Sequence, residues 1–334
     1  MNTDILKGSR KEGKKFVNLV PTDAGGLGVM FPILWEYITN KEENIPKKAL
    51  GPFKTDASIY DTPSESGLRV TWIGHSSLLI EIDGKRILTD PVWSQRVSFS
   101  QRIGPKRFFD APLLLKDLPA LDAVLISHDH YDHLDTGTIK YLAKLTVPFI
   151  CSIGVGQYLQ EWGVSAERIT EMDWGSVAYV GDVSITSTPS RHFAGRSLSN
   201  RNETLWASFV IKGPKHNIYF GADSGWFDGF KVIGDTYGPF DLTMLEVGAY
   251  GKHWPDIHMG PDNAANAHEA LRGKVMMPIH WGTFSLAPHA WYAPIERLEK
   301  IAKEKNIVLF SPEPGQPTDV TDKPLVTGWW RKFR

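Results

Sequence analysis

The chain has 334 residues, of which 42% are hydrophobic and 22% charged, so it is long and apolar enough to bury a large core. Its 37 Lys and Arg nearly balance its 38 Asp and Glu, which argues against nucleic acid as a partner. A single cysteine, Cys151, excludes a disulfide within the chain. Together with the absence of a signal peptide or an apolar stretch long enough to span a bilayer, it predicts a cytoplasmic protein.

Regular hydrophobic patterning starts near Leu68, after a mixed N-terminal extension that we place at residues 1–66. Alternation predicts strands at 69–73, 77–82 and 86–89, the last two joined by a tight turn at Asp83-Gly84. Further strands are expected at 123–127, 147–152, 177–180, 183–188, 205–211, 217–220, 242–247, 275–279 and 307–310. Helices are expected at 136–144, 156–162, 227–233, 261–271 and 294–303.

Strands dominate both halves of the chain, and helices are inserted between them. An α/β fold satisfies this order if two mixed sheets pack face to face and the helices cover their outer faces. We therefore predict a four-layer αββα sandwich. With no internal repeat and no linker in the sequence, residues 67–334 are expected to form one domain, on which the extension packs.

A histidine-rich segment carries the strongest chemical signal. It reads Ser-His-Asp-His-Tyr-Asp-His-Leu-Asp over residues 127–135 and directly follows a predicted strand. Imidazole nitrogens and carboxylate oxygens are the usual zinc ligands of hydrolytic sites. His128 and His130 can bind one metal ion, and Asp132 and His133 a second. The alternative, a polar surface loop without a metal, does not explain so many imidazoles in so few residues.

Three further residues follow predicted strands and could complete two metal sites. His192 and His280 each come just after a strand, and Asp223 lies between glycines at the end of another. Taken singly, each would more often have a structural role; an Asp in a Gly-rich turn, for example, commonly bonds its own backbone. Together with the histidine-rich segment, they favour metal ligands.

The pattern His-x-His-x-Asp-His, followed by a separated His, Asp and His, resembles the metallo-β-lactamase superfamily. The sequence is more closely similar to one branch, the N-acylphosphatidylethanolamine-hydrolysing phospholipase D family, from about Phe16 to Phe284. Gly-Pro-Lys-Arg-Phe at 104–108 and His-Trp-Gly-Thr-Phe at 280–284 are the most specific motifs. The resemblance implies a metallo-β-lactamase-like sandwich, with residues 67–334 as the metallo-hydrolase domain.

The resemblance also implies two zinc ions per chain, with iron or manganese as alternatives. It assigns His128, His130 and His192 to one ion and Asp132, His133 and His280 to the other, with Asp223 bridging them. Asp132 is also implied in catalysis, and His258 matches a family histidine beside the substrate head group.

We therefore expect a zinc-dependent phosphodiesterase of phospholipase D type that cleaves N-acylated phosphatidylethanolamine-like lipids through a metal-bound hydroxide. Asp132 would hold the hydroxide, and His258 would assist the leaving oxygen. One alternative is a lactonase or another ester hydrolase of the same superfamily. A second is a protein that binds its ligand through the metals without turnover.

Other residues near these motifs admit a structural interpretation. His75 would either orient a metal ligand or pack structurally, whereas Asp90, before Pro91, is expected to be a turn residue. Asp129 and Tyr131 alternate with the ligands and should point away from the metals. Cys151 is expected to be buried in a strand. The histidines expected at the surface or in structural roles are His216, His253, His268 and His289.

An apolar patch with an aromatic edge, Gly25–Trp35, lies between two groups of basic residues. Such a patch suits peripheral attachment to a membrane that contains anionic lipid. The alternative is that Phe31 and Trp35 pack on the body of the chain or on a second subunit of a homodimer. The basic residues are Lys7, Arg10, Lys11, Lys14 and Lys15 before the patch, and Lys47 and Lys48 after it.

Overall fold

The computed structural model describes residues 3–26, 28, 30–39, 41–197 and 199–334. Its larger sheet has eight strands in the order β17-β15-β14-β13-β12-β11-β10-β9. The strands from β12 to β17 run parallel and those from β9 to β12 antiparallel, so the sheet is mixed. Its strands are β9 (Val177–Val180), β10 (Val183–Thr188), β11 (Ser208–Lys212), β12 (Asn217–Phe220), β13 (Phe240–Glu246), β14 (Gly273–Ile279), β15 (Val308–Ser311) and β17 (Leu325–Val326).

The second sheet has seven strands in the order β16-β3-β4-β5-β6-β7-β8 and is also mixed. The strands from β16 to β5 pair antiparallel, and those from β5 to β8 pair parallel. Its strands are β3 (Leu68–Gly74), β4 (Ser77–Ile82), β5 (Lys85–Thr89), β6 (Ala123–Ile126), β7 (Phe149–Ser152), β8 (Ile169–Met172) and β16 (Thr318–Asp319).

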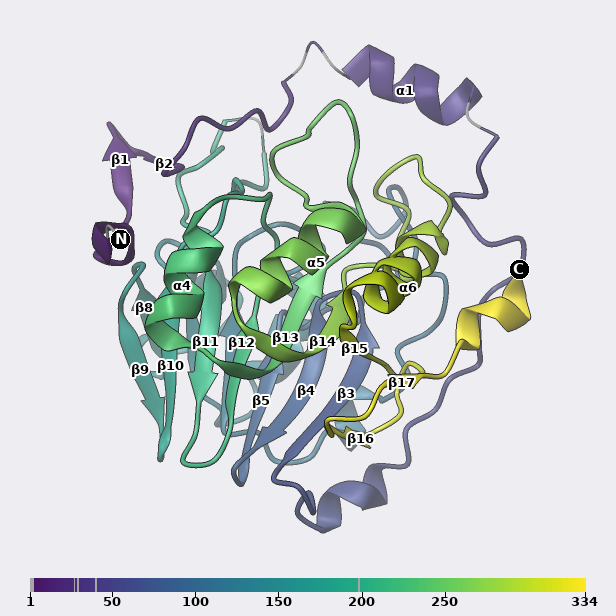
Figure 1. The fold of residues 1–334 in the computed structure, drawn as a ribbon. Coiled ribbons are helices and arrows are strands. Elements are labelled where there is room, and N and C mark those ends of the chain that lie inside the picture. The colour runs from purple at the N-terminus through teal and green to yellow at the C-terminus, as the bar shows by residue number, and fades with distance from the viewer. Residues whose placement is uncertain (1–2, 27, 29, 40, 198) are drawn as a thin grey trace.

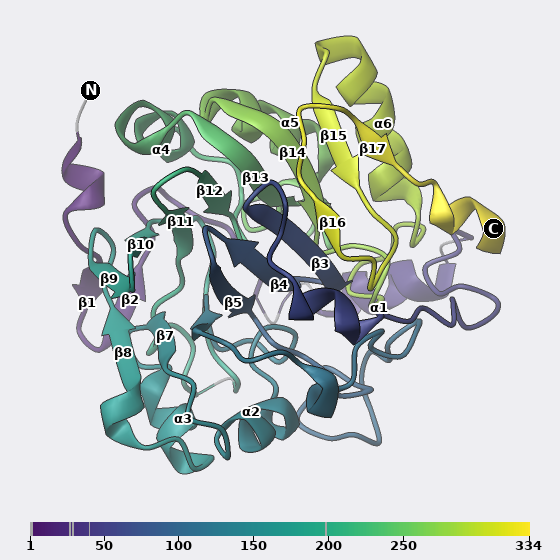
Figure 2. The same ribbon diagram turned by 90° about the horizontal axis from the view of Figure 1, so that it is seen from below.

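Helices cover the outer face of each sheet. Three of them, α4 (Gly229–Tyr237), α5 (Gly260–Ala270) and α6 (Ala293–Lys305), lie in front of the larger sheet in Figure 1. Two others, α2 (Thr136–Leu142) and α3 (Gly156–Glu161), lie on the far side of the second sheet (Figure 2). The four layers confirm the predicted αββα sandwich.

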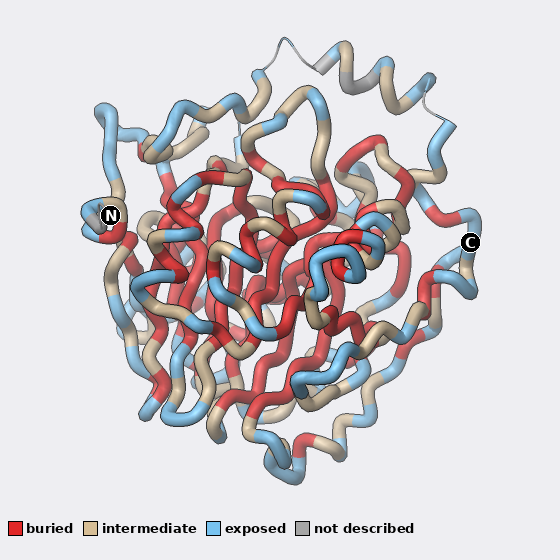
Figure 3. Tube along the Cα trace, viewed as in Figure 1, coloured by how far each residue is buried: buried red, intermediate tan, exposed pale blue. Residues whose placement is uncertain are grey.

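The strands of the second sheet bury both faces, because each face contacts a different layer. In β3, Val70 and Trp72 belong to the core between the sheets, whereas Ile73 belongs to the core under α2 and α3. In β6, Leu125 likewise belongs to the core between the sheets and Ile126 to the core under α2 and α3. This is the two-residue period of a strand, with an apolar neighbour on each side. Buried residues accordingly follow the strands, and exposed residues lie at the periphery (Figure 3).

The predicted hairpin at Asp83-Gly84 is confirmed. β4 and β5 pair up to Ile82 and Lys85, and both turn residues have positive φ, as the twist of a two-residue hairpin requires. The predicted strand at 205–211 is wrong in its first part, because β11 begins only at Ser208. Ala207 instead donates its main-chain N–H to the carbonyl of Ser127, so this stretch crosses toward the second sheet.

The segment before β3 contacts the body at several points. It contains a small hairpin, β1 (Arg10–Glu12) and β2 (Lys15–Val17), in which Phe16 is buried. It then forms a helix, α1 (Met30–Thr39), which the sequence did not predict and which lies at the top of Figure 1, away from the sheets. In the described part of the chain, no helix is long and apolar enough to cross a membrane.

Candidate metal centre

Predicted site residues from both sheets meet at one edge of the sandwich. The histidine-rich segment follows β6, His192 follows β10, Asp223 follows β12 and His280 follows β14. β12, β13 and β14 run parallel, so their carboxyl ends reach the same edge of the larger sheet. Polar side chains far apart in the sequence are thus brought together on rigid strand ends.

The first group contains His128, His130, His192 and Asp223, whose possible ligand atoms all lie within 4.8 Å of one another. Nδ1 of His130 is 2.9 Å from Nε2 of His128 and 3.3 Å from Nε2 of His192. Two ligand nitrogens of a tetrahedral zinc ion would lie about 3.3 Å apart, given Zn–N bonds of about 2.0–2.1 Å. The spacing of these nitrogens therefore fits a shared cation.

The second group contains His75, Asp132, His133 and His280, whose possible ligand atoms also lie within 4.8 Å of one another, and the sequence assigned the last three of these to a metal. Oδ2 of Asp132 lies 3.5 Å from Nε2 of His133 and 3.4 Å from Nε2 of His280. Asp223 lies between the two groups: its carboxylate oxygens are 3.2 Å from Nε2 of His133 and of His280, and 3.6 Å from Nε2 of His192. Asp223 can thus contribute to both groups, as a bridging ligand must.

Buried polar atoms in this cluster lack hydrogen bonds within the described part of the chain. They are Nε2 of His133, Nε2 of His280 and Oδ1 of Asp223. Leaving a buried polar atom unpaired costs about 1–3 kcal/mol, so several at one place call for a missing partner. Imidazole nitrogens and a carboxylate form a donor set that suits zinc, iron or manganese. The residues therefore fit a metal centre.

Neighbouring groups fix which nitrogen of His128, His133 and His192 faces the cluster. Asp90 accepts a hydrogen bond from Nδ1 of His133 (2.7 Å), and the carbonyl of Ile257 accepts one from Nδ1 of His192 (3.0 Å). Ser127 donates its hydroxyl to Asp90, so its oxygen can accept from Nδ1 of His128 (2.9 Å). In the neutral form of each ring, this bond leaves Nε2 unprotonated and directed at the cluster, as metal binding requires.

The charges in the cluster are strongly interdependent. Burial opposes ionisation of Asp223, but His133 and His280 outweigh it and hold the pKa of this carboxyl well below its usual range. Burial also opposes protonation of His280, yet Asp223 and Asp132 raise its pKa to about 10. Without a metal, protons on the imidazoles would thus balance the negative charge of the carboxylates. A divalent cation can replace these protons.

Asp90 and His75 lie next to the cluster. The turn role that the sequence favours for Asp90 is incomplete: the residue is fully buried and accepts from His133 and from both the main chain and the hydroxyl of Ser127. Nε2 of His75 lies 2.8 Å from Oδ2 of Asp132, so His75 orients that carboxylate. Of the two roles predicted for His75, orienting a metal ligand and packing structurally, the contact with Asp132 matches the first.

His258 lies beside the cluster, with its ring 5.2 Å from that of His192 and 5.3 Å from that of His280. Its Nδ1 is 2.5 Å from Oε2 of Glu246, which is fully buried and also accepts from the main-chain N–H groups of Ser224 and Met259. Glu246 was not among the residues predicted from the sequence. Its signal is a carboxylate at the last position of β13, directly after the apolar Met244 and Leu245.

Residues that were expected to be structural mostly are. Asp129 turns away from the cluster and accepts from the main-chain N–H of Gly195, and Tyr131 donates to the carbonyl of Arg196. Cys151 is buried in β7, and burial raises the pKa of its thiol. Four other histidines lie outside the cluster: His216 pairs with Asp83, His253 with Glu36, His268 with Thr243, and His289 with the carbonyl of Ala290.

A cavity of about 340 Å³ opens beside His258 and brings solvent to the edge of the cluster. Tyr250 and His289 form one wall, with their rings stacked 4.5 Å apart. Glu36, from α1, also lines the cavity and pairs with Lys252 and His253 at 3.2 Å. The cavity therefore lies between His258 and a residue of α1.

This arrangement of possible metal ligands at the edge of an αββα sandwich defines a class of proteins. Residues 85–281 match the family model described as the β-lactamase superfamily domain. The chain belongs to this metallo-β-lactamase superfamily of metal-dependent hydrolases.

The chain is also similar to several known proteins. An uncharacterised protein of Mycobacterium tuberculosis is 45% identical over 322 residues, which cover 95% of this chain and 86% of that protein. An N-acyl-phosphatidylethanolamine-hydrolysing phospholipase D of Caenorhabditis elegans is 37% identical over 254 residues, covering 72% of this chain and 71% of that protein. A solved metallo hydrolase from Ignicoccus hospitalis shares the fold, with a TM-score of 0.59, 22% identity, and coverage of 75% of this chain and 97% of that one.

Proposed function

We propose that the chain is a phosphodiesterase of phospholipase D type that acts on N-acylated phosphatidylethanolamine-like lipids. The products would be a phosphatidate-like acid and an N-acylated amino alcohol. The observation that carries the proposal is the pair of ligand groups joined at Asp223, in a chain 37% identical to a phospholipase D of that specificity.

We assign two zinc ions to each chain. His128, His130 and His192 would hold one and Asp132, His133 and His280 the other, with Asp223 shared between them. When bound, such ions act as Lewis acids toward a phosphoryl group and lower the pKa of water toward neutrality.

His258 and Glu246 would handle a proton during cleavage. Because Glu246 accepts from Nδ1 of His258, it fixes the orientation of the ring and leaves Nε2 for the substrate. Nε2 of His258 would hydrogen-bond the leaving oxygen and give it a proton, as a general acid does. Burial raises the pKa of Glu246, and His258 partly offsets this effect.

Asp132 has a role beyond holding a metal. His75 donates to one of its oxygens at 2.8 Å, and the imidazoles of His133 and His280 lie within 3.5 Å of the same oxygen. Although burial acts in the opposite direction, these neighbours hold the pKa of Asp132 well below its usual range. The ionised carboxylate can accept a hydrogen bond from the attacking hydroxide and hold it in line with the substrate.

The segment at 1–66 would act as an extension of the hydrolase domain at 67–334 and support its site. Asn18 makes two hydrogen bonds with the main chain of His192, donating to the carbonyl at 2.7 Å and accepting from the N–H at 3.1 Å. Removing the extension would therefore loosen a residue that we assign to a metal.

Peripheral contact with a membrane is the second part of the proposal. Phe31, Trp35 and Ile38 of α1 are 73%, 59% and 68% exposed, so they do not pack on the body of their own chain. Their spacing places them along one side of the helix. An exposed apolar stripe of this kind suits shallow insertion among lipids. Leu27 and Val29 of the predicted patch lie outside the described residues.

A substrate panel tests the activity. The metal-loaded protein is offered an N-acylated phosphatidylethanolamine, a bis-aryl phosphodiester and a set of lactones, with Asp132→Asn as the inactive comparison. We expect the lipid to be cleaved fastest and the variant to lose most of this turnover while keeping its fold. Faster cleavage of lactones would favour an ester hydrolase, and binding without turnover would favour a metal-dependent binding protein.

A further inference from the structure

A second and larger cavity lies next to the proposed site but plays no part in it. Its volume is about 600 Å³, within the range of small-molecule sites. Tyr37 of α1 lines it on one side and Arg96 and Gly104 of the 96–106 loop on another. Asn44 and Ser285 line both this cavity and a small pocket that His280 also lines. A ligand here would thus lie close to the metal centre without occupying it.

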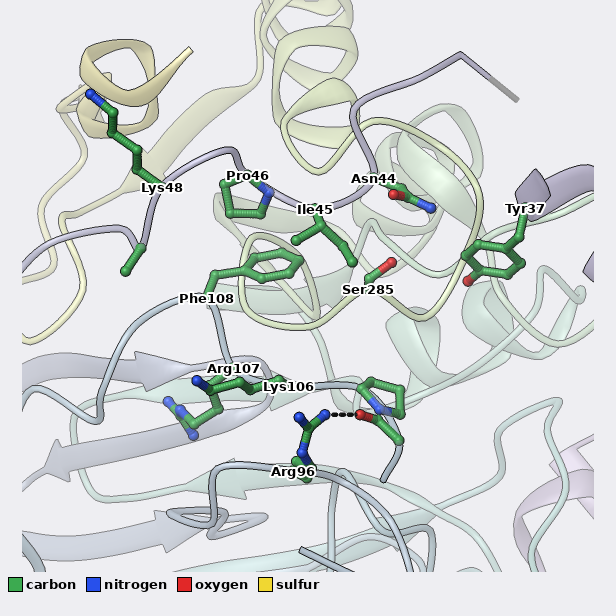
Figure 4. A pocket seen from close by; sticks show the side chains of 13 residues that line it. Tyr37, Asn44, Ile45, Pro46, Lys48, Arg96, Lys106, Arg107, Phe108 and Ser285 are labelled. Carbon is green, nitrogen blue, oxygen red and sulfur yellow. Dashed lines mark hydrogen bonds between the residues drawn. The ribbon is translucent and has the colours of Figure 1, made fainter. Parts of the chain in front are cut away.

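One side of the cavity is positively charged. Arg96, Lys106 and Arg107 gather there in Figure 4, and Lys48 lies farther along the rim. The guanidinium of Arg96 donates to the carbonyl of Gly104, and within the described residues no carboxylate pairs with Arg96 or Lys106. No Asp or Glu of the described chain lines this cavity. Cations that converge on a cavity without an acidic partner form a binding site for an anion.

Arg107 adds a buried charge to those of Arg96 and Lys106. Its buried guanidinium donates to the main-chain carbonyls of Phe109, Val92 and Ile73 at 2.8–3.1 Å and to no carboxylate of the described chain. Burial lowers its pKa to about 10, partly offset by Asp135 and Asp110, so it stays protonated at neutral pH. A charge held this way, without an ion pair, is stabilised by an anion in the cavity.

The facing side of the cavity is apolar. Ile45, Pro46 and Phe108 lie there in Figure 4, opposite the basic side chains. Ile45 is 60% exposed, although large apolar side chains usually find cover. Phe99 and Ile103, on the 96–106 loop that borders the cavity, are also exposed, at 74% and 55%. The cavity thus joins a cationic wall to an apolar wall that lacks cover.

We propose that this cavity binds a phosphomonoester that carries an apolar chain. Arg96 and Lys106 would contact the phosphate, and Ile45 and Phe108 the chain. Several converging cations match a phosphate that carries close to two negative charges better than a carboxylate with one. Such a ligand could be a lipid head group or a free alkyl phosphate. The assignment rests on the cavity alone and stands whether or not the chain cleaves phosphodiesters.

Calorimetric titration of the metal-loaded protein with octyl phosphate tests the site directly. Arg96→Gln/Lys106→Gln is compared with Lys116→Gln/Lys140→Gln, which removes the same charge from exposed positions away from the cavity. We expect the first variant to bind at least tenfold more weakly than the parent, and the second to bind as the parent does. Equal affinity of both variants would place the bound phosphate at the metals instead and overturn the proposal, as would failure of the parent to bind.

The apolar wall is tested with inorganic phosphate and octyl glucoside as further probes. Octyl phosphate should bind at least tenfold more tightly than either, and Ile45→Ser should reduce its advantage over inorganic phosphate. If octyl phosphate and inorganic phosphate bind equally, the assigned apolar chain is wrong. Sedimentation with phosphatidate vesicles separates the two sources: a lipid head group predicts loss of binding in Arg96→Gln/Lys106→Gln, and a free alkyl phosphate predicts no change.

Discussion

The metal centre and α1 depart from the usual distribution of polar and apolar groups in opposite directions. At the centre, Nε2 of His133, Nε2 of His280 and Oδ1 of Asp223 are buried without hydrogen bonds in the described chain. On α1, Phe31 and Trp35 are exposed without cover. Each arrangement is unfavourable in the isolated chain. The comparison teaches that each region indicates the chemistry of the partner it suits. Unpaired buried nitrogens and a carboxylate oxygen suit a cation, and exposed aromatic rings suit an apolar surface.

The two missing partners should differ greatly in strength. A structural zinc site in a protein contributes on the order of 10 kcal/mol at neutral pH. Burying one large apolar side chain contributes about 1.5–3 kcal/mol, and shallow insertion among lipids realises only a part of this. Changes at the metal centre should therefore have the larger effects, and changes on α1 the smaller ones.

Asp223→Ala should produce the largest effect. Asp223 lies within 3.6 Å of imidazoles from both ligand groups, so its loss should empty or scramble both metal positions and lower activity roughly a thousandfold. Elemental analysis of freshly prepared protein should find two transition-metal ions per chain in the parent and fewer than one in the variant. Asp235→Ala, which removes an exposed carboxylate from α4, should change neither quantity. Full metal content in Asp223→Ala would refute the bridging role.

Glu246→Gln should reduce activity by about a hundredfold without loss of metal, because Glu246 positions His258 and belongs to neither assigned ligand group. The amide keeps one acceptor oxygen for the N–H groups of Ser224 and Met259, so the fold should persist. If the two residues act as one unit, His258→Gln in the Glu246→Gln background should cost little more. Fully additive losses in kcat/KM would show that they act independently.

Asp90→Asn should weaken metal binding by about 10–100-fold and leave the fold intact. Asp90 holds Nδ1 of His133 at 2.7 Å, and a neutral amide would no longer favour the tautomer that directs Nε2 at the metal. Competition with a chromogenic chelator measures the change. Asp122→Asn is a matched control, because Asp122 accepts from Lys85 and Arg86 at the start of β5, away from the centre. An equal effect in both variants would point to general destabilisation.

The fold could be predicted largely because strand alternation and turn residues are local signals. Asp83-Gly84 specifies its hairpin without help from distant residues. The histidine-rich segment was equally visible, since its residues are adjacent in sequence. The residues that we missed or misread depend on which strand ends meet. Asp90 and Glu246 acquire their roles only through His133 and His258, and no local pattern shows those contacts.

α1 illustrates a second limit. Its sequence carries Pro32 and several residues with low helix propensity, and the stripe of Phe31, Trp35 and Ile38 faces solvent instead of a core. The apolar patch was recognised, but its helical form was not. Packing on the body, which the sequence left open, is wrong for Phe31 and Trp35. A membrane and a second subunit are the partners that still fit.

Phe31→Ser/Trp35→Ser separates these two partners and should have the smallest effect on the enzyme itself. Because both side chains are exposed, the variant should keep the Tm and the kcat/KM for a soluble substrate that the parent has. Membrane contact predicts that co-sedimentation with anionic vesicles falls about tenfold or more, since each buried ring contributes on the order of 1 kcal/mol or more. Val177→Ser/Tyr179→Ser, which removes two exposed apolar side chains from β9, is the matched control and should sediment as the parent does. If the parent never binds vesicles and the α1 variant instead changes from dimer to monomer on gel filtration, the stripe covers a second copy of the chain. The comparison between a centre whose buried side chains suit a cation and a helix whose exposed side chains suit an apolar cover would then hold, with a protein surface in place of the membrane.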